Sequence, residues 1–220
     1  MLDVLLPENC VLCGLPPRNL CSACLETLTP QPQWQRLDNL WLCHAGAPEQ
    51  PTLVMIRAFK DEFRTGLSKH LARLVAPAVH AAIQRFGRPD VFVVPPSPLS
   101  SWRRRGFVPM HVILRRVGIH PYRALARSPE FLGLFRRRRD QRGLTIEQRA
   151  LNVAGAFRPR HNLAGARVMI VDDVVTTGAT LAEAVRALES AGASVVCAVS
   201  MVRVAPRRKK VMDDIPSTQA

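Results

Sequence analysis

Three short runs of apolar residues along the chain predict strands buried in a parallel sheet. They lie at residues 90–94, 167–171 and 194–204, and each is rich in valine. Between the last two runs, apolar side chains recur at helical spacing over residues 179–191, and Gly192 follows just past the end. A strand, a turn, a helix and a second strand within about 35 residues predict a βαβ unit with parallel strands and a right-handed connection.

A longer helical pattern precedes the first of these runs. Its apolar face is formed by Leu67, Leu71, Leu74, Ala78 and Ala81. Pro77 falls within the pattern, so we expect it to kink the helix or to begin a new one. Gly87 and Pro89 end the segment, and a shorter helix is expected over about residues 110–117. Helices alternating with buried strands predict an α/β fold with a parallel sheet flanked by helices.

The segments outside this pattern divide the chain into three parts. Residues 1–50 hold four closely spaced cysteines and a linker, and residues 51–205 hold the predicted sheet and helices. Within the first part, residues 26–52 are rich in proline and glutamine, which predicts an irregular linker or a lid on a small metal module. Residues 206–220 are polar, basic and then acidic, which predicts a disordered tail.

Composition limits the class of protein. The chain has 220 residues, of which 47% are hydrophobic, enough for one α/β domain with a small accessory unit. No apolar run approaches the length of a membrane-spanning helix, so no membrane span is expected. The first residues, MLDVLLPENC, lack the basic region and cleavage site of a signal peptide. We therefore expect a cytoplasmic protein, and the sequence leaves its oligomeric state, a dimer included, undetermined.

The formal net charge of +14 comes almost entirely from arginine. Such an excess of base implies attraction to phosphates, nucleic acid or acidic surfaces. A coding bias toward arginine explains the choice of base but not its excess over acid. Basic residues crowd between Trp102 and Arg160, so we expect part of that stretch to be mobile without a ligand.

Four of the six cysteines form two Cys-x-x-Cys pairs near the N-terminus. The pairs are Cys10 with Cys13 and Cys21 with Cys24. In an intracellular chain such pairs are more often metal ligands than disulfides, and four thiolates complete one tetrahedral Zn²⁺ site. We expect a structural zinc, because a closed site of four thiolates has no open position for a substrate. Reduced cysteines without metal, or a redox pair, are the alternatives.

The stretch VDDVVTTGAT, residues 171–180, carries the most specific chemistry. Two carboxylates, Asp172 and Asp173, stand at the carboxyl end of an apolar strand, where α/β sheets bind ligands. The turn that follows presents backbone N–H groups at a helix N-terminus, which makes an anion site. The turn consists of Thr176, Thr177, Gly178, Ala179 and Thr180. Phosphate is the expected ligand, because glycine permits close backbone approach and the threonine hydroxyls add hydrogen-bond donors.

A sugar phosphate fits both halves of this stretch. The two carboxylates can accept hydrogen bonds from vicinal ribose hydroxyls while the turn holds a 5-phosphate. The stretch is neither a P-loop, since Gly-Lys-Ser/Thr is missing, nor a dinucleotide fingerprint, since the glycine pattern is missing. An ordinary strand end with a helix cap is the alternative, but it does not explain two adjacent acids followed by five small residues.

Residues 168–180 resemble the phosphoribosyl pyrophosphate (PRPP) motif of type I phosphoribosyltransferases. More narrowly, the chain resembles the ComF family of phosphoribosyltransferases, which is linked to competence and DNA uptake. The narrower match rests on the cysteine pairs, the Pro96–Leu99 loop, the run from Arg103 to Phe107 and the segment QRGLTIEQRALNVAGAF at residues 141–157. Together these stretches span roughly residues 10–180.

The resemblance implies a parallel sheet with a small hood, and Mg²⁺-PRPP as the ligand. It places the loop that contains Pro96 and Ser97 near the pyrophosphate. It also implies that the segment with Arg104, Arg105 and Gly106 is the mobile loop that closes over PRPP, where arginines stabilise a polyanionic leaving group. In a transferase Asp172 and Asp173 would hold the ribose and offset positive charge that develops at C1. A solvated basic surface is the alternative reading of each arginine.

One position departs from the family. Asn-Gln usually follows Arg-Gly-Phe, whereas this chain has Val108-Pro109, which offers no side-chain hydrogen bonds and fixes one φ angle. The sequence therefore leaves three functions open. The first is a transferase acting on an unknown acceptor, and the second is a PRPP- or nucleotide-sensing regulator. The third is a competence factor that binds single-stranded DNA through its basic residues and through Trp34, Trp41 and Trp102.

Overall fold

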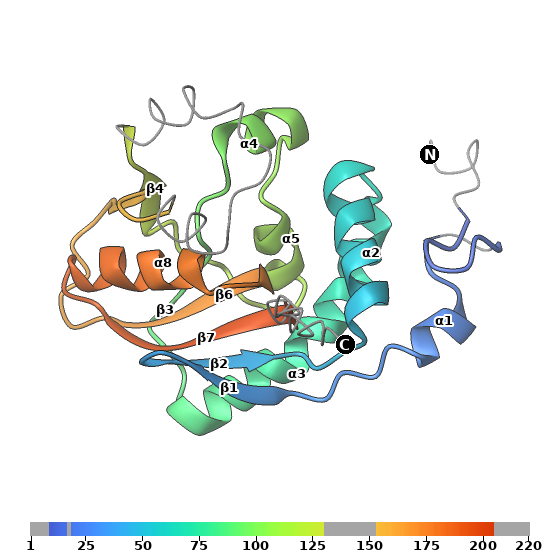
Figure 1. The fold of residues 1–220 in the computed structure, drawn as a ribbon, viewed down its shortest axis with the longest axis horizontal. Coiled ribbons are helices and arrows are strands. Elements are labelled where there is room, and N and C mark those ends of the chain that lie inside the picture. The colour runs from blue at the N-terminus through green and yellow to red at the C-terminus, as the bar shows by residue number, and fades with distance from the viewer. Residues whose placement is uncertain (1–8, 17–18, 130–152, 205–220) are drawn as a thin grey trace, which may run out of the picture.

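A computed structural model describes residues 9–16, 19–129 and 153–204 of the chain. The central feature is a five-stranded sheet with the strand order β1-β2-β7-β6-β3. Its strands are β1 (Gln33–Leu37), β2 (Leu40–His44), β3 (Val91–Val93), β6 (Arg167–Val175) and β7 (Ser194–Arg203). Neighbours from β2 to β3 pair in parallel, and only the edge strand β1 pairs antiparallel. The predicted α/β fold with a mostly parallel sheet is confirmed (Figure 1).

The predicted βαβ unit is confirmed, with one change in length. Strand β6 leads into α8 (Ala179–Glu189), and β7 returns parallel to β6. Strand β6 extends to Val175, so both Asp172 and Asp173 lie within the paired strand, where Asp172 is opposite Ser200. Hydrogen bonds to a central neighbour therefore fix the backbone that carries the two carboxylates.

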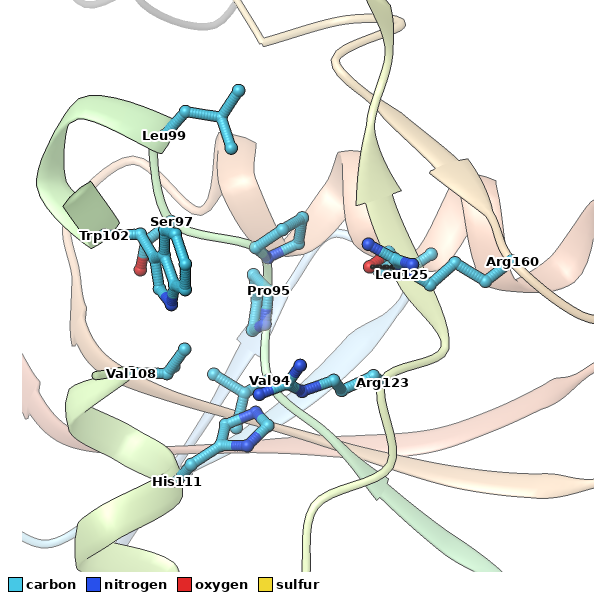
Figure 2. A pocket seen from close by; sticks show the side chains of 11 residues that line it. Val94, Pro95, Ser97, Leu99, Trp102, Val108, His111, Arg123, Leu125 and Arg160 are labelled. Carbon is cyan, nitrogen blue, oxygen red and sulfur yellow. Dashed lines mark hydrogen bonds between the residues drawn. The ribbon is translucent and has the colours of Figure 1, made fainter. Parts of the chain in front are cut away.

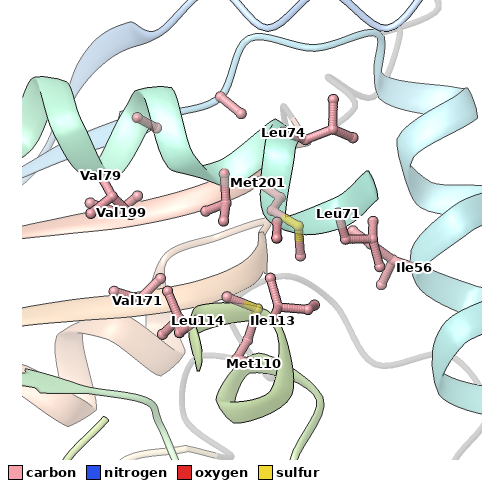
Figure 3. Packing of buried hydrophobic residues seen from close by; sticks show 14 of the residues in the cluster. Ile56, Leu71, Leu74, Val79, Met110, Ile113, Leu114, Val171, Val199 and Met201 are labelled. Carbon is pink, nitrogen blue, oxygen red and sulfur yellow. The ribbon is translucent and has the colours of Figure 1, made fainter. Parts of the chain in front are cut away.

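One face of the sheet is covered by three helices: α2 (Glu49–Asp61), α3 (Ser68–Phe86) and α5 (Pro109–Arg115). Figure 3 shows side chains of all three packing onto β6 and β7, among them Ile56, Leu71 and Ile113. The strands alternate, since Val171 belongs to this core while Ile170 belongs to the core on the opposite face. The predicted helices over residues 67–86 and 110–117 are confirmed, and α3 continues through Pro77, so no new helix begins there.

The opposite face is covered by α8 and by a two-stranded sheet of β4 (Leu125–Arg127) and β5 (Phe157–Pro159). Glu183 of α8 is buried, and its carboxylate accepts hydrogen bonds from the Phe157 amide at 2.9 Å and from Arg186 at 2.7 Å. Because a buried carboxylate needs such partners, this bond network fixes β5 against α8.

The prediction of an irregular linker over residues 26–52 is wrong for residues 33–44. Strands β1 and β2 form a hairpin, and β2 joins the main sheet beside β7. The two-residue turn at Asp38 and Asn39 contains a positive φ at Asp38, a conformation that aspartate tolerates better than most residues. Polar residues between the tryptophans concealed this edge hairpin. The boundary at residue 50 stays a prediction, but the sheet takes two strands from before it.

Several predictions fall on residues that the structure leaves undescribed. These are the disordered tail at residues 206–220 and residues 141–152 of the segment that carries part of the family resemblance. Within the described ranges, no helix is both long and apolar enough to cross a membrane.

Candidate functional site

The two carboxylates of β6 meet a lysine from the helical layer. Lys60, near the C-terminal end of α2, forms an ion pair with Asp173. The side chains of Lys60 and Asp173 are 21% and 16% exposed, so the pair is partly shielded from water. Asp172 accepts a hydrogen bond from the backbone amide of Asp173 at 2.9 Å. The carboxylate site therefore includes one cation that comes from more than 100 residues upstream.

Asp172 has an altered proton affinity. Burial and, after it, the neighbouring charge of Asp173 together raise the pKa of Asp172 from its ordinary value to about 7, against the lowering effects of the Asp173 amide and Lys60. Two carboxylates in one site resist joint ionisation. A bound ligand that donates hydrogen bonds to Asp172 would favour its ionised form.

The turn between β6 and α8 has the geometry of an anion site. Gly178 caps α8 with a φ of +84°, and the position of a Cβ there would lie 3.3 Å from a methyl group of Leu37. Thr177 accepts a hydrogen bond from the Ala179 amide at 3.3 Å. The amides of Thr180 and of the next residue fall in the first helical turn and have no carbonyl partner within the helix. Thr176–Thr180 thus form the turn into α8, and their binding of a phosphate stays a prediction.

Arg203, which the sequence analysis did not single out, contacts the start of this turn. The Arg203 guanidinium donates hydrogen bonds to the carbonyl oxygens of Val204 at 2.8 Å and of Thr176. It also donates to Gln35 of β1 at 3.2 Å. Burial lowers the pKa of Arg203. Because this side chain engages the carbonyl of Thr176, it orients the start of the turn.

A cavity of about 300 Å³ lies beside the loop that follows β3 (Figure 2). Pro96 and Ser97 both line it, and their predicted place near the pyrophosphate stays a prediction. Strand β3 pairs with β6 at Val93 and Ile170, so this loop and the carboxylates lie at the same edge of the sheet. The remaining lining residues are Val94, Pro95, Leu99, Trp102, Val108, His111, Arg123, Leu125 and Arg160.

The segment with Arg104, Arg105 and Gly106 is not a loop throughout. Residues 99–105 form helix α4 (Leu99–Arg105), and Gly106 caps it with a φ of +72°. Asp61 of α2 pairs with Arg104 at 2.8 Å and with Arg105 at 2.9 Å. The hydrogen bond from Arg105 lowers the pKa of Asp61. The expected loop is helical over residues 99–105, whereas its mobility and the contact of these arginines with pyrophosphate stay predictions.

The departure at Val108 and Pro109 has a structural role. Pro109 is the first residue of α5 and is buried, and a proline fits that position because its missing N–H has no helical partner there. Val108 precedes the helix and lines the cavity. The loss of polar side chains at these positions gives the cavity an apolar wall.

The four N-terminal cysteines converge. The sulfur atoms of Cys10, Cys13, Cys21 and Cys24 all lie within 4.8 Å of one another, and the Cys13 and Cys21 sulfurs are 3.7 Å apart. Zn–S bonds of about 2.3 Å in a tetrahedron place sulfurs about 3.8 Å apart, so the cluster fits a metal such as zinc. Gly14 adopts a φ of +75° just after the first pair, a left-handed conformation that glycine adopts readily in a tight turn.

Sequence reasoning missed three residues near the predicted site: Lys60, Asp61 and Arg203. Lys60 had a usable signal, because lysine occurs at only four positions in an arginine-rich chain. Asp61 and Arg203 had none, since each acts on residues more than 25 positions away.

Comparison with known proteins agrees with this geometry. Residues 75–219 match the model of the family described as "Phosphoribosyl transferase domain". A protein named DNA utilization protein YhgH from Salmonella typhi is 30% identical over 189 residues, covering 85% of this chain and 80% of the relative. The YhgH protein of Escherichia coli K12 is 30% identical over 191 residues, with 85% of this chain and 80% of the relative covered.

A protein named Competence protein F from Haemophilus influenzae is 26% identical over 190 residues, covering 83% of this chain and 79% of the relative. The predicted resemblance to ComF proteins is confirmed by these relatives. The matched region contains strands β3, β6 and β7, the two carboxylates and the turn that follows them. The chain therefore belongs to the phosphoribosyl transferase domain family, and within it to the ComF-type proteins.

Proposed function

We propose that the protein binds PRPP and, with Mg²⁺, transfers its phosphoribosyl group to an acceptor with release of pyrophosphate. The observation that carries the proposal is the carboxylate pair Asp172 and Asp173 in the strand that leads into the Thr176–Thr180 turn. This juxtaposition fits ribose hydroxyls on the acids and the 5-phosphate on the backbone amides of the turn.

Each part of the site has a role in this proposal. The turn and the α8 N-terminus hold the 5-phosphate, and Asp172 and Asp173 hold the ribose and offset positive charge at C1. Lys60 pairs with one carboxylate and so reduces the mutual repulsion of the two acids. Mg²⁺ would enter with the pyrophosphate and reduce its charge as it leaves.

Calorimetry with Mg²⁺-PRPP tests the proposal. We expect binding by the unaltered chain and a loss of at least about a hundredfold in Asp172→Asn/Asp173→Asn, since several charge-assisted hydrogen bonds disappear together. Glu26→Gln, an exposed change in α1 (Ser22–Glu26), is the matched control. Absence of binding, or equal binding by the double variant, contradicts the proposal. Pyrophosphate release with candidate acceptors then separates a transferase from a PRPP- or nucleotide-sensing regulator.

A structural zinc at the cysteine cluster is part of the same proposal. Four sulfur ligands would close the coordination sphere, so the ion would stabilise residues 10–24 and take no part in the reaction. We expect one metal ion per chain. We also expect its release when thiol-modifying reagents react with the cluster.

Single-stranded DNA is a second candidate ligand, favoured by one surface. The Arg85 guanidinium lies 4.6 Å from the ring centre of Trp34 and 4.1 Å from that of Trp41, and Arg36 lies 5.2 Å from the Trp41 ring. The exposed arginines and half-buried tryptophans combine charge with faces for stacking. The names of the relatives refer to DNA utilization and competence. Trp102 lies apart from this surface, beside the Pro96–Ser97 cavity.

Fluorescence anisotropy with a labelled oligonucleotide tests this second function. Affinity should fall steeply with salt, fall further in Arg36→Gln/Arg85→Gln, and persist when PRPP is added. Arg73→Gln, an exposed change elsewhere on α3, is the control. No detectable affinity at low salt rules out this function.

A further inference from the structure

The cavity beside the Pro96–Ser97 loop has an unusual combination of walls. Its flat apolar surfaces come from Pro95, Pro96 and Val108, and the Trp102 ring, 49% exposed, stands at one side (Figure 2). Flat apolar and aromatic surfaces favour a planar ring over a flexible chain. The volume of about 300 Å³ suits a single substituted ring, because it lies at the lower limit of ligand cavities.

The charge of the cavity is one-sided. Arg123 and Arg160 both line it, and its lining includes no acidic residue among the described parts of the chain. Arg123 forms no hydrogen bond or ion pair within the ranges that the structure covers, so its guanidinium is free to bind an anion. Arg160 uses its Nε to donate to the Leu125 carbonyl at 3.2 Å, which leaves its terminal nitrogens available.

His111 adds a polar group that carries no charge at neutral pH. Burial lowers the pKa of His111, and the charges of Arg123 and Arg115 lower it further. A neutral imidazole both donates and accepts hydrogen bonds. The cavity therefore offers two fixed cations and one neutral hydrogen-bonding group against apolar walls, a set that matches a ring with an acidic substituent.

The cavity lies beside the carboxylates and turn of the proposed PRPP site, and it shares with that site only the Pro96–Ser97 loop, which is predicted to lie near the pyrophosphate. No residue of Asp172–Thr180 lines the cavity, yet its Val94–Ser97 wall follows β3, which pairs with β6. A ligand here would therefore sit at the carboxyl edge of the sheet, next to the strand that would hold the ribose.

We propose that this cavity binds the acceptor, and that the acceptor is a six-membered nitrogen heterocycle bearing a carboxylate. The role as acceptor rests on the proposed transferase function. In the transfer, a lone pair on the ring nitrogen forms the bond to ribose C1, and the C1–O bond breaks with its electrons leaving on pyrophosphate. Where the nitrogen carries a hydrogen, that proton is released to water. Arg123 and Arg160 hold the carboxylate, and Trp102 covers the ring.

Binding of matched probes without PRPP tests the site and the ligand class. Nicotinate and orotate should bind the full chain at least about tenfold more tightly than nicotinamide and uracil, because only the acids engage the guanidiniums. Arg123→Gln and Arg160→Gln should each weaken the acids about tenfold, and Trp102→Ala should weaken acids and amides alike. Arg158→Gln, an exposed change in β5 outside the cavity lining, is the matched control.

Thermal unfolding of each variant separates loss of binding from loss of folding, and Arg123→Gln is decisive because Arg123 has no hydrogen bond to lose among the residues that the structure describes. The proposal is overturned if the acids bind no more tightly than nicotinamide and uracil, or if neither arginine change affects binding of the acids. Tight binding of pyrophosphate alone in this cavity, displacing the acids, also overturns it. The Asp172→Asn/Asp173→Asn variant should keep acid binding. Acid binding without PRPP binding would therefore refute the transferase function and support the ligand class.

Discussion

Two regions at the carboxyl edge of the sheet meet at the proposed PRPP site, and they are built in opposite ways. The β6–α8 region takes its carboxylates and its turn from nine consecutive residues, Asp172–Thr180. The α2–α4 region joins Lys60 and Asp61 to Asp173, Arg104 and Arg105, over sequence separations of 43 to 113 residues. The first region depends on local backbone geometry, whereas the second depends on how a helix packs.

This difference has a functional consequence. In the local region, one substitution in the turn alters the ligand site directly. In the distant region, consecutive residues of α2 engage the site and α4 at once, so a change in α2 affects both. The position of α2 is linked to the cysteine module, because Arg64, just after α2, donates a hydrogen bond to the carbonyl of Asn9.

Loss of the metal from the cysteine cluster should have the largest effect. Structural zinc sites contribute about 10 kcal/mol or more of folding free energy in small modules, so Cys13→Ser/Cys21→Ser should unfold residues 10–24. The core packing of Cys10 and Leu20 would be lost with them. Metal content and thermal unfolding measure this effect, with Cys43→Ser as the comparison outside the cluster. If the double variant unfolds at the same temperature as the unaltered chain, the stability of the fold does not depend on the cysteine module.

A substitution in the turn between β6 and α8 should have the next largest effect, which is a loss of PRPP affinity. Gly178→Ala forces a left-handed backbone that costs roughly 1–2 kcal/mol for an alanine, and its Cβ would press on Leu37. We expect PRPP affinity by calorimetry to fall by more than about tenfold. Gly165→Ala is the control, since Gly165 has a φ of +75° but no atom within 4 Å of a Cβ there. Equal losses of affinity in both variants would show that backbone strain, and not the turn, is responsible.

Ionisation of Asp172 should change PRPP affinity by a similar or smaller factor than Gly178→Ala does. Its folded pKa of about 7 lies above the ordinary value of 3.8. Between these values the folded chain binds more protons than the unfolded chain, so this group makes unfolding easier as pH rises through that window. PRPP affinity should rise about tenfold from pH 6 to pH 8 as the carboxyl ionises to accept hydroxyl groups.

Asp172→Asn should remove both the fall in stability and its share of the pH dependence of binding. The phosphates of PRPP titrate in both proteins, so the difference between the two pH profiles is the quantity to measure. Identical profiles would assign the whole dependence to the ligand.

Removal of Lys60 should have the smallest effect on binding. Lys60→Met leaves Asp173 without its cation, and we expect PRPP to bind about three- to tenfold more weakly at pH 7. Lys60→Arg should restore part of the affinity, and Lys69→Met, an exposed change on α3, is the control. Tighter binding by Lys60→Met would mean that Lys60 competes with the ribose for Asp173.

Local sequence patterns account for the features that could be predicted, and tertiary contacts account for those that could not. The βαβ unit was predictable because its strands and helix have clear periodicity, and the turn residues at Thr176–Thr180 are contiguous. The helix around Arg104 was not predicted because its like charges are offset by ion pairs with Asp61, which comes from a distant helix. The hairpin of β1 and β2 escaped prediction because β2 pairs with β7 and packs against α3, which are distant contacts that no local pattern shows.

By itself the sequence determined the α/β class, the adjacent carboxylates with the turn that follows them, and the two cysteine pairs. Each of these depends on residues a few positions apart, whose backbone geometry follows from local sterics and spacing. Tertiary structure alone decided that Lys60 faces Asp173, and that Trp102, Arg123 and Arg160 line one cavity. These contacts form only when packing of the two cores brings distant segments together, and no local pattern encodes such distances.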